Sequence, residues 1–192
     1  MYFIKEEYED TLEVKQSKFI AHLTPYAEYE TLLQKLKQQH PKARHFVTAY
    51  RYLNEYEQIV EHSSDDGEPA GTSGKPSLMV LQGQELINTA VIIVRYFGGI
   101  KLGTGGLVRA YSDAVNLVIK KADLHKYNKE VTKNIIFDYS DVRFIDYECK
   151  EFDITISHKE FDSKVSYKIT ASEENMKDFL TKTARIITML ER

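Results

Sequence analysis

The residues best suited to chemistry form a glycine-rich segment that follows the pattern of a buried strand. Five glycines lie between positions 98 and 106, directly after the apolar run Val91–Val94. Each glycine weakens regular structure by roughly 1 kcal/mol, so this many in one turn indicate positive φ angles or a close backbone approach. From Leu107 onward the apolar spacing is helical. A loop that leads into a helix N-terminus points unpaired N–H groups at one spot, where an anion fits.

Basic residues on both sides of this loop strengthen the prediction of an anion site. Arg95, Lys101 and Arg109 place positive charge around it. The loop lacks the GK[ST] ending of a Walker loop and the GxGxxG spacing of a dinucleotide fingerprint, so a tight strand-to-helix turn is the alternative interpretation. The predicted phosphate- or nucleic-acid-binding residues are Lys75, Arg95, Gly98, Gly99, Lys101, Gly103, Gly105, Gly106 and Arg109.

A second polar stretch, SSDDGEPAGTSGK at 63–75, carries three carboxylates, from Asp65, Asp66 and Glu68. Carboxylate oxygens at this density can hold Mg²⁺, although the spacing is not that of an EF-hand and a solvated acidic loop is the alternative. All nine glycines of the chain lie between Gly67 and Gly106. We therefore expect the two glycine-bearing loops to form one site. The histidines and the single cysteine have no zinc-ligand spacing.

Hydrophobic periodicity predicts the elements that position these loops, and the fold class is α+β with two domains. The N-terminal part has expected strands at 11–14, 18–23, 46–53 and 91–94, helices at 28–39, at 76–82 and from 107 onward, and a polar loop at 54–75. The C-terminal part has strands at 130–139, 152–157, 165–171 and 185–190, with helices at 141–150 and 172–183. That βαββαβ order is ferredoxin-like. The polar connector DLHKYNKE places the boundary between domains 1–125 and 126–192.

Charge and composition limit the possible partners. The net charge is −3, and residues 1–125 carry 14 Lys and Arg against 16 Asp and Glu. A nucleic-acid site must therefore be a local patch rather than a generally basic surface. One cysteine excludes an internal disulfide, the acidic N-terminus is unlike a signal peptide, and no apolar run approaches a membrane span. We expect a cytoplasmic protein with no membrane partner.

The sequence resembles the IMPACT family, and within it the bacterial YigZ-type proteins. Four segments carry the resemblance: QSKFIAHL at 16–23, HPKARHFVTAYRY at 40–52, SSDDGEPAGTSGKP at 63–76 and VIIVRYFGGIKLGTGGLVRAYSDAV at 91–115. The resemblance implies an N-terminal domain with the fold of the second domain of a small-subunit ribosomal protein. It also implies a C-terminal ferredoxin-like domain similar to one of the translocating elongation factor. Eukaryotic members are described as regulators of translation under amino-acid stress.

Three functions follow from the residues and the resemblance. The first is a translation-associated regulatory protein that binds RNA, the ribosome or translation factors through the basic glycine-rich loop. The second is a Mg²⁺-dependent phosphoryl-transfer or nucleotide-binding enzyme, in which the glycine loop cradles phosphate and Asp65 or Asp66 holds the metal. The third is a protein-interaction module that uses the ferredoxin-like sheet. No general base stands out, so the sequence favours a non-enzymatic protein, with no cofactor unless Mg²⁺ binds.

Overall fold

A computed structural model describes residues 1–189 and divides the chain into two compact units, Met1–Tyr127 and Asn128–Arg192. The last residues of the first unit pair with its first residues. Strand β7 (His125–Lys126) pairs with β1 (Tyr2–Phe3), and the Tyr127 N–H donates to the Met1 carbonyl at 3.0 Å. Each unit has a hydrophobic core of its own. Among the described residues, no helix is long and apolar enough to cross a membrane.

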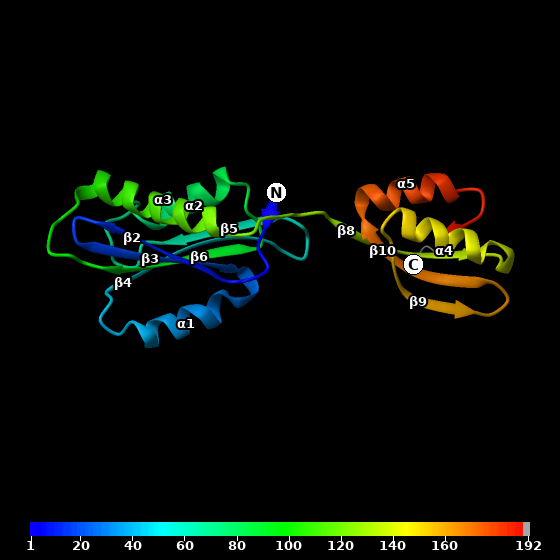
Figure 1. Ribbon diagram of the computed structural model, residues 1–192, viewed down its shortest axis with the longest axis horizontal. Coiled ribbons are helices and arrows are strands. Elements are labelled where there is room, and N and C mark those ends of the chain that lie inside the picture. The colour runs from blue at the N-terminus through cyan, green and yellow to red at the C-terminus, as the bar shows by residue number, and fades with distance from the viewer. Residues whose placement is uncertain (190–192) are drawn as a thin grey trace. The chain divides into compact units, whose positions relative to one another are not determined.

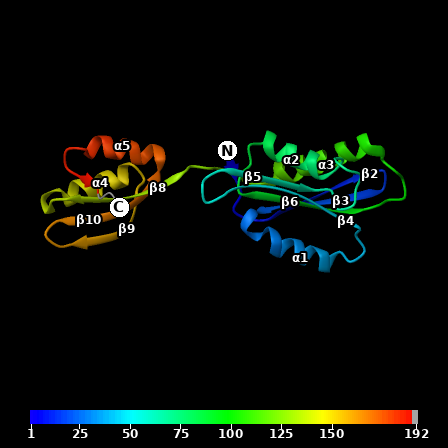
Figure 2. The same ribbon diagram turned by 180° about the vertical axis from the view of Figure 1, so that it is seen from behind.

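The first unit is built on a five-stranded antiparallel sheet in the order β2-β3-β6-β4-β5. Its strands are β2 (Tyr8–Val14), β3 (Ser17–Pro25), β4 (His45–Leu53), β5 (Ile59–Ser64) and β6 (Thr89–Tyr96). Helices α2 (Gly74–Gly83) and α3 (Gly103–Lys121) cover one face, and α1 (Tyr29–Gln39), after a short 3-10 turn at Tyr26–Glu28, covers the other (Figures 1 and 2). Because β6 is central and covered on both sides, its sequence is a continuous apolar run.

Alternation along the strands assigns each side chain to one of two cores. Phe19 and Ala21 of β3 pack with Tyr111 and its apolar neighbours beneath α2 and α3. Ile20, the residue between them, packs with Leu36 beneath α1. Successive side chains of a strand point to opposite faces, so a slip of one residue would exchange the two cores. The buried faces therefore determine the register of the sheet.

Three local predictions differ from the structure. β5 lies inside the segment 54–75 that was expected to be a loop, because this edge strand is largely exposed and polar and has no apolar periodicity. Helix α3 begins at Gly103 rather than near Leu107, because its first turn contains glycines that carry no hydrophobic signal. The strand expected at 152–157 is β9 (Thr155–Phe161), because the residues after α4 complete the end of that helix.

The second unit has the predicted βαββαβ order and the strand order β11-β8-β10-β9, all antiparallel. Its elements are β8 (Glu130–Phe137), a short 3-10 turn (Tyr139–Asp141), α4 (Val142–Glu151), β9, β10 (Val165–Ser172), α5 (Glu173–Thr183) and β11 (Thr188–Met189). The α+β class and the ferredoxin-like arrangement are confirmed. The expected last strand, 185–190, ends on Leu190, which lies outside the described residues. Both helices cover one face of the sheet (Figure 1). The other face is polar, with the Thr132 and Thr170 hydroxyls bonded to each other at 2.8 Å.

Candidate functional site

A pocket of about 800 Å³ opens at the end of the first sheet where β4 begins and β6 ends. Four segments that are distant in sequence contribute to it: the residues before β4, the acidic loop, the end of β6 and the start of α3. Its lining residues are Lys42, Arg44, His45, Glu68, Pro69, Arg95, Tyr96, Phe97, Lys101, Leu102, Gly103, Thr104 and Leu107. Both loops singled out in the sequence thus reach the same pocket.

The lining is positively charged. Lys42, Arg44 and Lys101 are exposed, and within residues 1–189 none of them forms an ion pair. Arg95 and Glu68, which also line the pocket, form an ion pair, so their charges neutralise each other. Three free cations thus face one opening on a chain whose net charge is −3. Such local concentration raises the positive potential at the pocket without making the whole surface basic.

The N-terminus of α3 adds partial positive charge to the same opening. Its N-cap residue is Leu102, which cannot accept a hydrogen bond through its side chain, and its first turn contains no acidic residue. The first N–H groups of the helix therefore have no side-chain acceptor. The macrodipole of this 19-residue helix places about half a positive charge there. Gly103 and Thr104, at this helix start, line the pocket.

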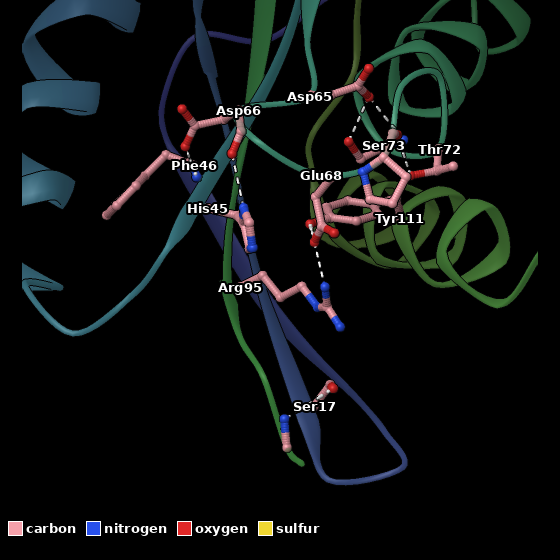
Figure 3. Close-up of polar contacts among 12 residues, drawn as sticks. Ser17, His45, Phe46, Asp65, Asp66, Glu68, Thr72, Ser73, Arg95 and Tyr111 are labelled. Carbon is pink, nitrogen blue, oxygen red and sulfur yellow. Dashed lines mark hydrogen bonds and ion pairs between the residues drawn. The ribbon is translucent and has the colours of Figure 1, made fainter. Parts of the chain in front are cut away.

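A buried ion pair belongs to the lining of the pocket, and Figure 3 shows its two side chains, Arg95 and Glu68. The Arg95 Nη1 donates to Glu68 Oε1 at 2.5 Å, and the Tyr111 hydroxyl donates to the same oxygen at 2.8 Å. Burial raises the pKa of Tyr111, and the adjacent Glu68 carboxylate raises it further, so the hydroxyl keeps its proton. The Arg95 guanidinium lies 5.4 Å from the Phe19 ring centroid and 5.7 Å from that of Phe97. The sequence predicts that Arg95 binds phosphate, but one nitrogen of its guanidinium is thus already bonded to Glu68.

The Nε atom of Arg95 takes no part in the hydrogen bond to Glu68. Arg95 is only 6% exposed, and its buried Nε has no hydrogen-bond partner among the described residues. A buried donor without an acceptor costs about 1–3 kcal/mol. Native structures seldom keep such a donor without a reason.

The Asp65 carboxylate caps helix α2. Its Oδ1 accepts from the Ser73 hydroxyl at 2.6 Å and from the Ser73 and Gly74 amides, while its Oδ2 accepts from the Gly71 amide. Burial by itself would raise the pKa of Asp65. The hydrogen bonds from the Ser73 hydroxyl and the three amides outweigh burial and lower that pKa. This side chain is therefore an acceptor for the helix N-terminus, and it needs no cation.

The other two carboxylates of the acidic loop also have separate partners, as Figure 3 shows. Asp66 accepts from the Phe46 amide at 2.6 Å, and its own carbonyl is bonded to His45. Glu68 points to Arg95 and Tyr111. In the described part of the chain, no group of three His, Cys, Asp or Glu side chains is arranged to hold a metal ion. The three carboxylates of Asp65, Asp66 and Glu68 thus do not converge on one point, as the expected Mg²⁺ site requires. Each of them accepts hydrogen bonds from a different set of backbone and side-chain donors.

Several glycines of the basic loop serve the turn itself. A Cβ on Gly98 would lie 2.0 Å from the Gln16 carbonyl carbon, so only glycine permits the loop to approach the β2–β3 turn this closely. Gly99 and Gly103 have φ angles of +88° and +74°. A Cβ on Gly105, in contrast, would meet nothing within 4 Å. Local geometry thus explains three of these glycines and leaves Gly105 unexplained.

The predicted residues divide into two groups. Arg95, Lys101 and Gly103 line the pocket, whereas Lys75, Gly98, Gly99, Gly105, Gly106 and Arg109 do not. Lys75 is exposed in the first turn of α2, and Arg109 is exposed on α3.

Sequence reasoning missed the cations before β4, Lys42 and Arg44, and the aromatic ring of Phe97. A usable signal existed in the basic segment HPKARH at 40–45, immediately before a strand. Its relevance depends on the pairing of β4 with β6, which places His45 opposite Arg95.

Comparisons with known proteins agree with this fold. Residues 15–119 match the family described as the Impact N-terminal domain, and that segment contains every residue that lines the pocket. An IMPACT family member of Haemophilus influenzae is 35% identical over 170 residues, covering 87% of this chain and 82% of the relative. YigZ, an IMPACT family member of Escherichia coli, is 30% identical over 175 residues, covering 90% and 86%. The crystal structure of a hypothetical protein aligns with a TM-score of 0.65 at 27% identity, covering 100% of this chain and 96% of that chain.

Proposed function

The chain belongs to the IMPACT family, and from that premise we propose that it is a cytoplasmic, translation-associated regulatory protein that binds RNA through the basic pocket at the start of α3. The family resemblance supports the link to translation. The pocket supports the binding of phosphate groups. The observation that carries the proposal is the group of three cations, Lys42, Arg44 and Lys101, which have no ion-pair partner within residues 1–189 and line the same pocket as the start of α3.

The charges indicate how RNA would bind. A chain with a net charge of −3 gains little from long-range attraction to RNA, so affinity must come from direct contacts in the pocket. Charge-assisted hydrogen bonds to phosphate contribute about 1.5–3 kcal/mol each. Three cations that neutralise three phosphates on a single strand give a slope of about −2 for log K against log salt concentration. This slope is much shallower than that of a protein with a broadly basic surface.

The same geometry favours binding over phosphoryl transfer. A Mg²⁺-dependent reaction would need carboxylates that face the phosphate, and Asp65 and Asp66 are bonded to backbone amides instead. The remaining carboxylate of the acidic loop, that of Glu68, is occupied by Arg95 and Tyr111. His45, the histidine of the lining, bonds through Nδ1 to the Asp66 carbonyl. The groups of the pocket are thus arranged to hold an anion.

The test compares two double variants that remove the same charge. Arg44→Ala/Lys101→Ala removes two cations from the pocket. Lys35→Ala/Lys120→Ala removes two exposed cations that do not line it. Binding of a fluorescent ribosomal RNA fragment is titrated at two salt concentrations, and co-sedimentation with ribosomes is measured in parallel.

We expect the pocket variant to lose about 100-fold or more in affinity, since each of the two lost contacts contributes about 1.5–3 kcal/mol and about 1.4 kcal/mol is a factor of ten. Its salt slope should become shallower by about 0.7 units per cation removed, the value for a single strand. The control should bind like the wild type. Equal losses in both variants would show that general charge, and not the pocket, binds the RNA. Binding that does not respond to salt would refute the phosphate contacts altogether.

A further inference from the structure

We infer that the pocket holds one unpaired nucleotide of a single-stranded RNA, with its base stacked on Phe97 and its phosphate at the start of α3. This inference rests on the proposed function and names the form of RNA that the site accepts. It begins from a feature that phosphate binding does not use: a large aromatic ring in the lining. Phe97 is 55% exposed and directly follows the last residue of β6.

The Phe97 ring packs against a cation and belongs to an anchored segment of the chain. The Arg95 guanidinium lies 5.7 Å from the ring centroid, and it is itself fixed by the buried pair with Glu68. The next residue, Gly98, lies close to the backbone of the β2–β3 turn, and its N–H donates to the Ser17 hydroxyl at 3.2 Å. A ring that is backed by a cation and anchored in the chain gives up little freedom when a base stacks on it. Proteins that bind single strands use exposed aromatic rings next to cationic groups in this way.

The remaining lining matches the other parts of a nucleotide. The volume of about 800 Å³ lies within the range of small-ligand sites. Lys101, Gly103 and Thr104 are positioned for the phosphate, because they belong to or directly precede the uncapped first turn of α3. The buried Nε of Arg95, another lining residue, has no hydrogen-bond partner among the described residues, so the pocket also contains a buried donor that an oxygen of the nucleotide can satisfy.

These features select a single strand over a duplex. In a duplex the base faces are stacked on one another, so a ring on the protein surface can reach phosphates, sugars and base edges but no base face. Single-stranded loops and ends expose their bases for stacking on aromatic side chains. An exposed Phe97 would add nothing to duplex binding, whereas it would add one stacked base to single-strand binding.

The test uses a short single-stranded RNA and the same strand annealed to its complement. Phe97→Leu removes the aromatic face and keeps an apolar side chain. Phe161→Leu is the matched control, since Phe161 is also 55% exposed but lies on β9 of the second unit. Phe97→Trp restores the aromatic face, and because the chain has no other tryptophan it also reports stacking through quenching of its fluorescence.

We expect Phe97→Leu to weaken single-strand binding by roughly 5- to 100-fold and to leave duplex binding unchanged. Phe97→Trp should bind the single strand at least as well as the wild type and should be quenched on binding. Phe161→Leu should change neither. Equal affinity of Phe97→Leu and wild type for the single strand, or no quenching of bound Phe97→Trp, overturns the inference. If the Arg44→Ala/Lys101→Ala variant still loses affinity in that case, the proposed function stands; if the wild type binds neither RNA, both fail.

Discussion

The buried Arg95–Glu68 pair allows a prediction whose size follows from the structure. Glu68→Gln keeps the shape of the side chain and an oxygen that can accept from both Arg95 and Tyr111, as Oε1 does here, but it removes the compensating charge. The side chains of Arg95 and Glu68 are only 7% and 3% exposed, so water cannot replace the lost charge. A buried charge that loses its partner costs about 3–5 kcal/mol. Because the amide oxygen can keep both hydrogen bonds, we expect a loss near the lower end of that range, about 3 kcal/mol.

For a unit of this size, such a loss lowers the melting temperature on the order of 10 °C. The measurement is urea unfolding followed by circular dichroism, combined with hydrogen exchange to assign the transition to the first unit. Glu61→Gln is the matched control. It also removes a carboxylate from an arginine, Arg51, at an Nε–Oε1 distance of 2.7 Å, but the Glu61 side chain is 31% exposed. The Arg51 side chain is only 10% exposed, but it also donates to the Leu86 carbonyl at 2.8 Å and its carboxylate partner is within reach of water, so we expect a cost smaller than that of Glu68→Gln.

A double-mutant cycle decides whether the pair acts as described. Arg95→Met removes the cation, and the combination Glu68→Gln/Arg95→Met removes both charges. The double variant should be clearly more stable than the sum of the single losses predicts, because neither charge is then left buried alone. Additive losses, or a loss in Glu68→Gln no larger than in Glu61→Gln, would refute the reasoning.

Two further predictions concern the loops. Gly98→Ala should destabilise the first unit by about 1–3 kcal/mol because its Cβ would meet the Gln16 backbone, while Gly105→Ala should stabilise it by about 0.5–1 kcal/mol because its Cβ meets nothing and alanine favours the helix. Urea unfolding measures both changes, and equal effects would contradict the two environments. Asp65→Asn should be destabilising at neutral pH. In the wild type, the lowered pKa of the Asp65 carboxyl stabilises the folded state at pH values above the pKa of the unfolded chain, and this stability is lost as the folded carboxyl protonates. The difference in unfolding free energy between the variant and the wild type should therefore shrink as pH falls below about 4. Unfolding free energies from pH 7 to pH 3 test this, and a difference that does not vary with pH would exclude the charged cap.

The sequence by itself determined the features that depend on neighbours along the chain. The apolar run of β6, the stripe of α3 and the βαββαβ order of the second unit all follow from local periodicity. The Ser172 cap of α5, which accepts from the Asn175 amide at 3.1 Å, is likewise a short-range signal. The family motifs could also be recognised from the sequence, because each of them is a continuous segment of the chain.

The tertiary structure alone decided which of the chemically suggestive residues share a site. Glu68 and Arg95 are 27 residues apart, and they meet because the acidic loop packs against the end of β6. Lys42 and Arg44 reach the pocket because β4 pairs with β6 rather than with β3. Side-chain periodicity reports which face of an element is buried, but it contains no information on which strands are neighbours. The order of the strands therefore brought an unpredicted basic segment to the pocket at the start of α3.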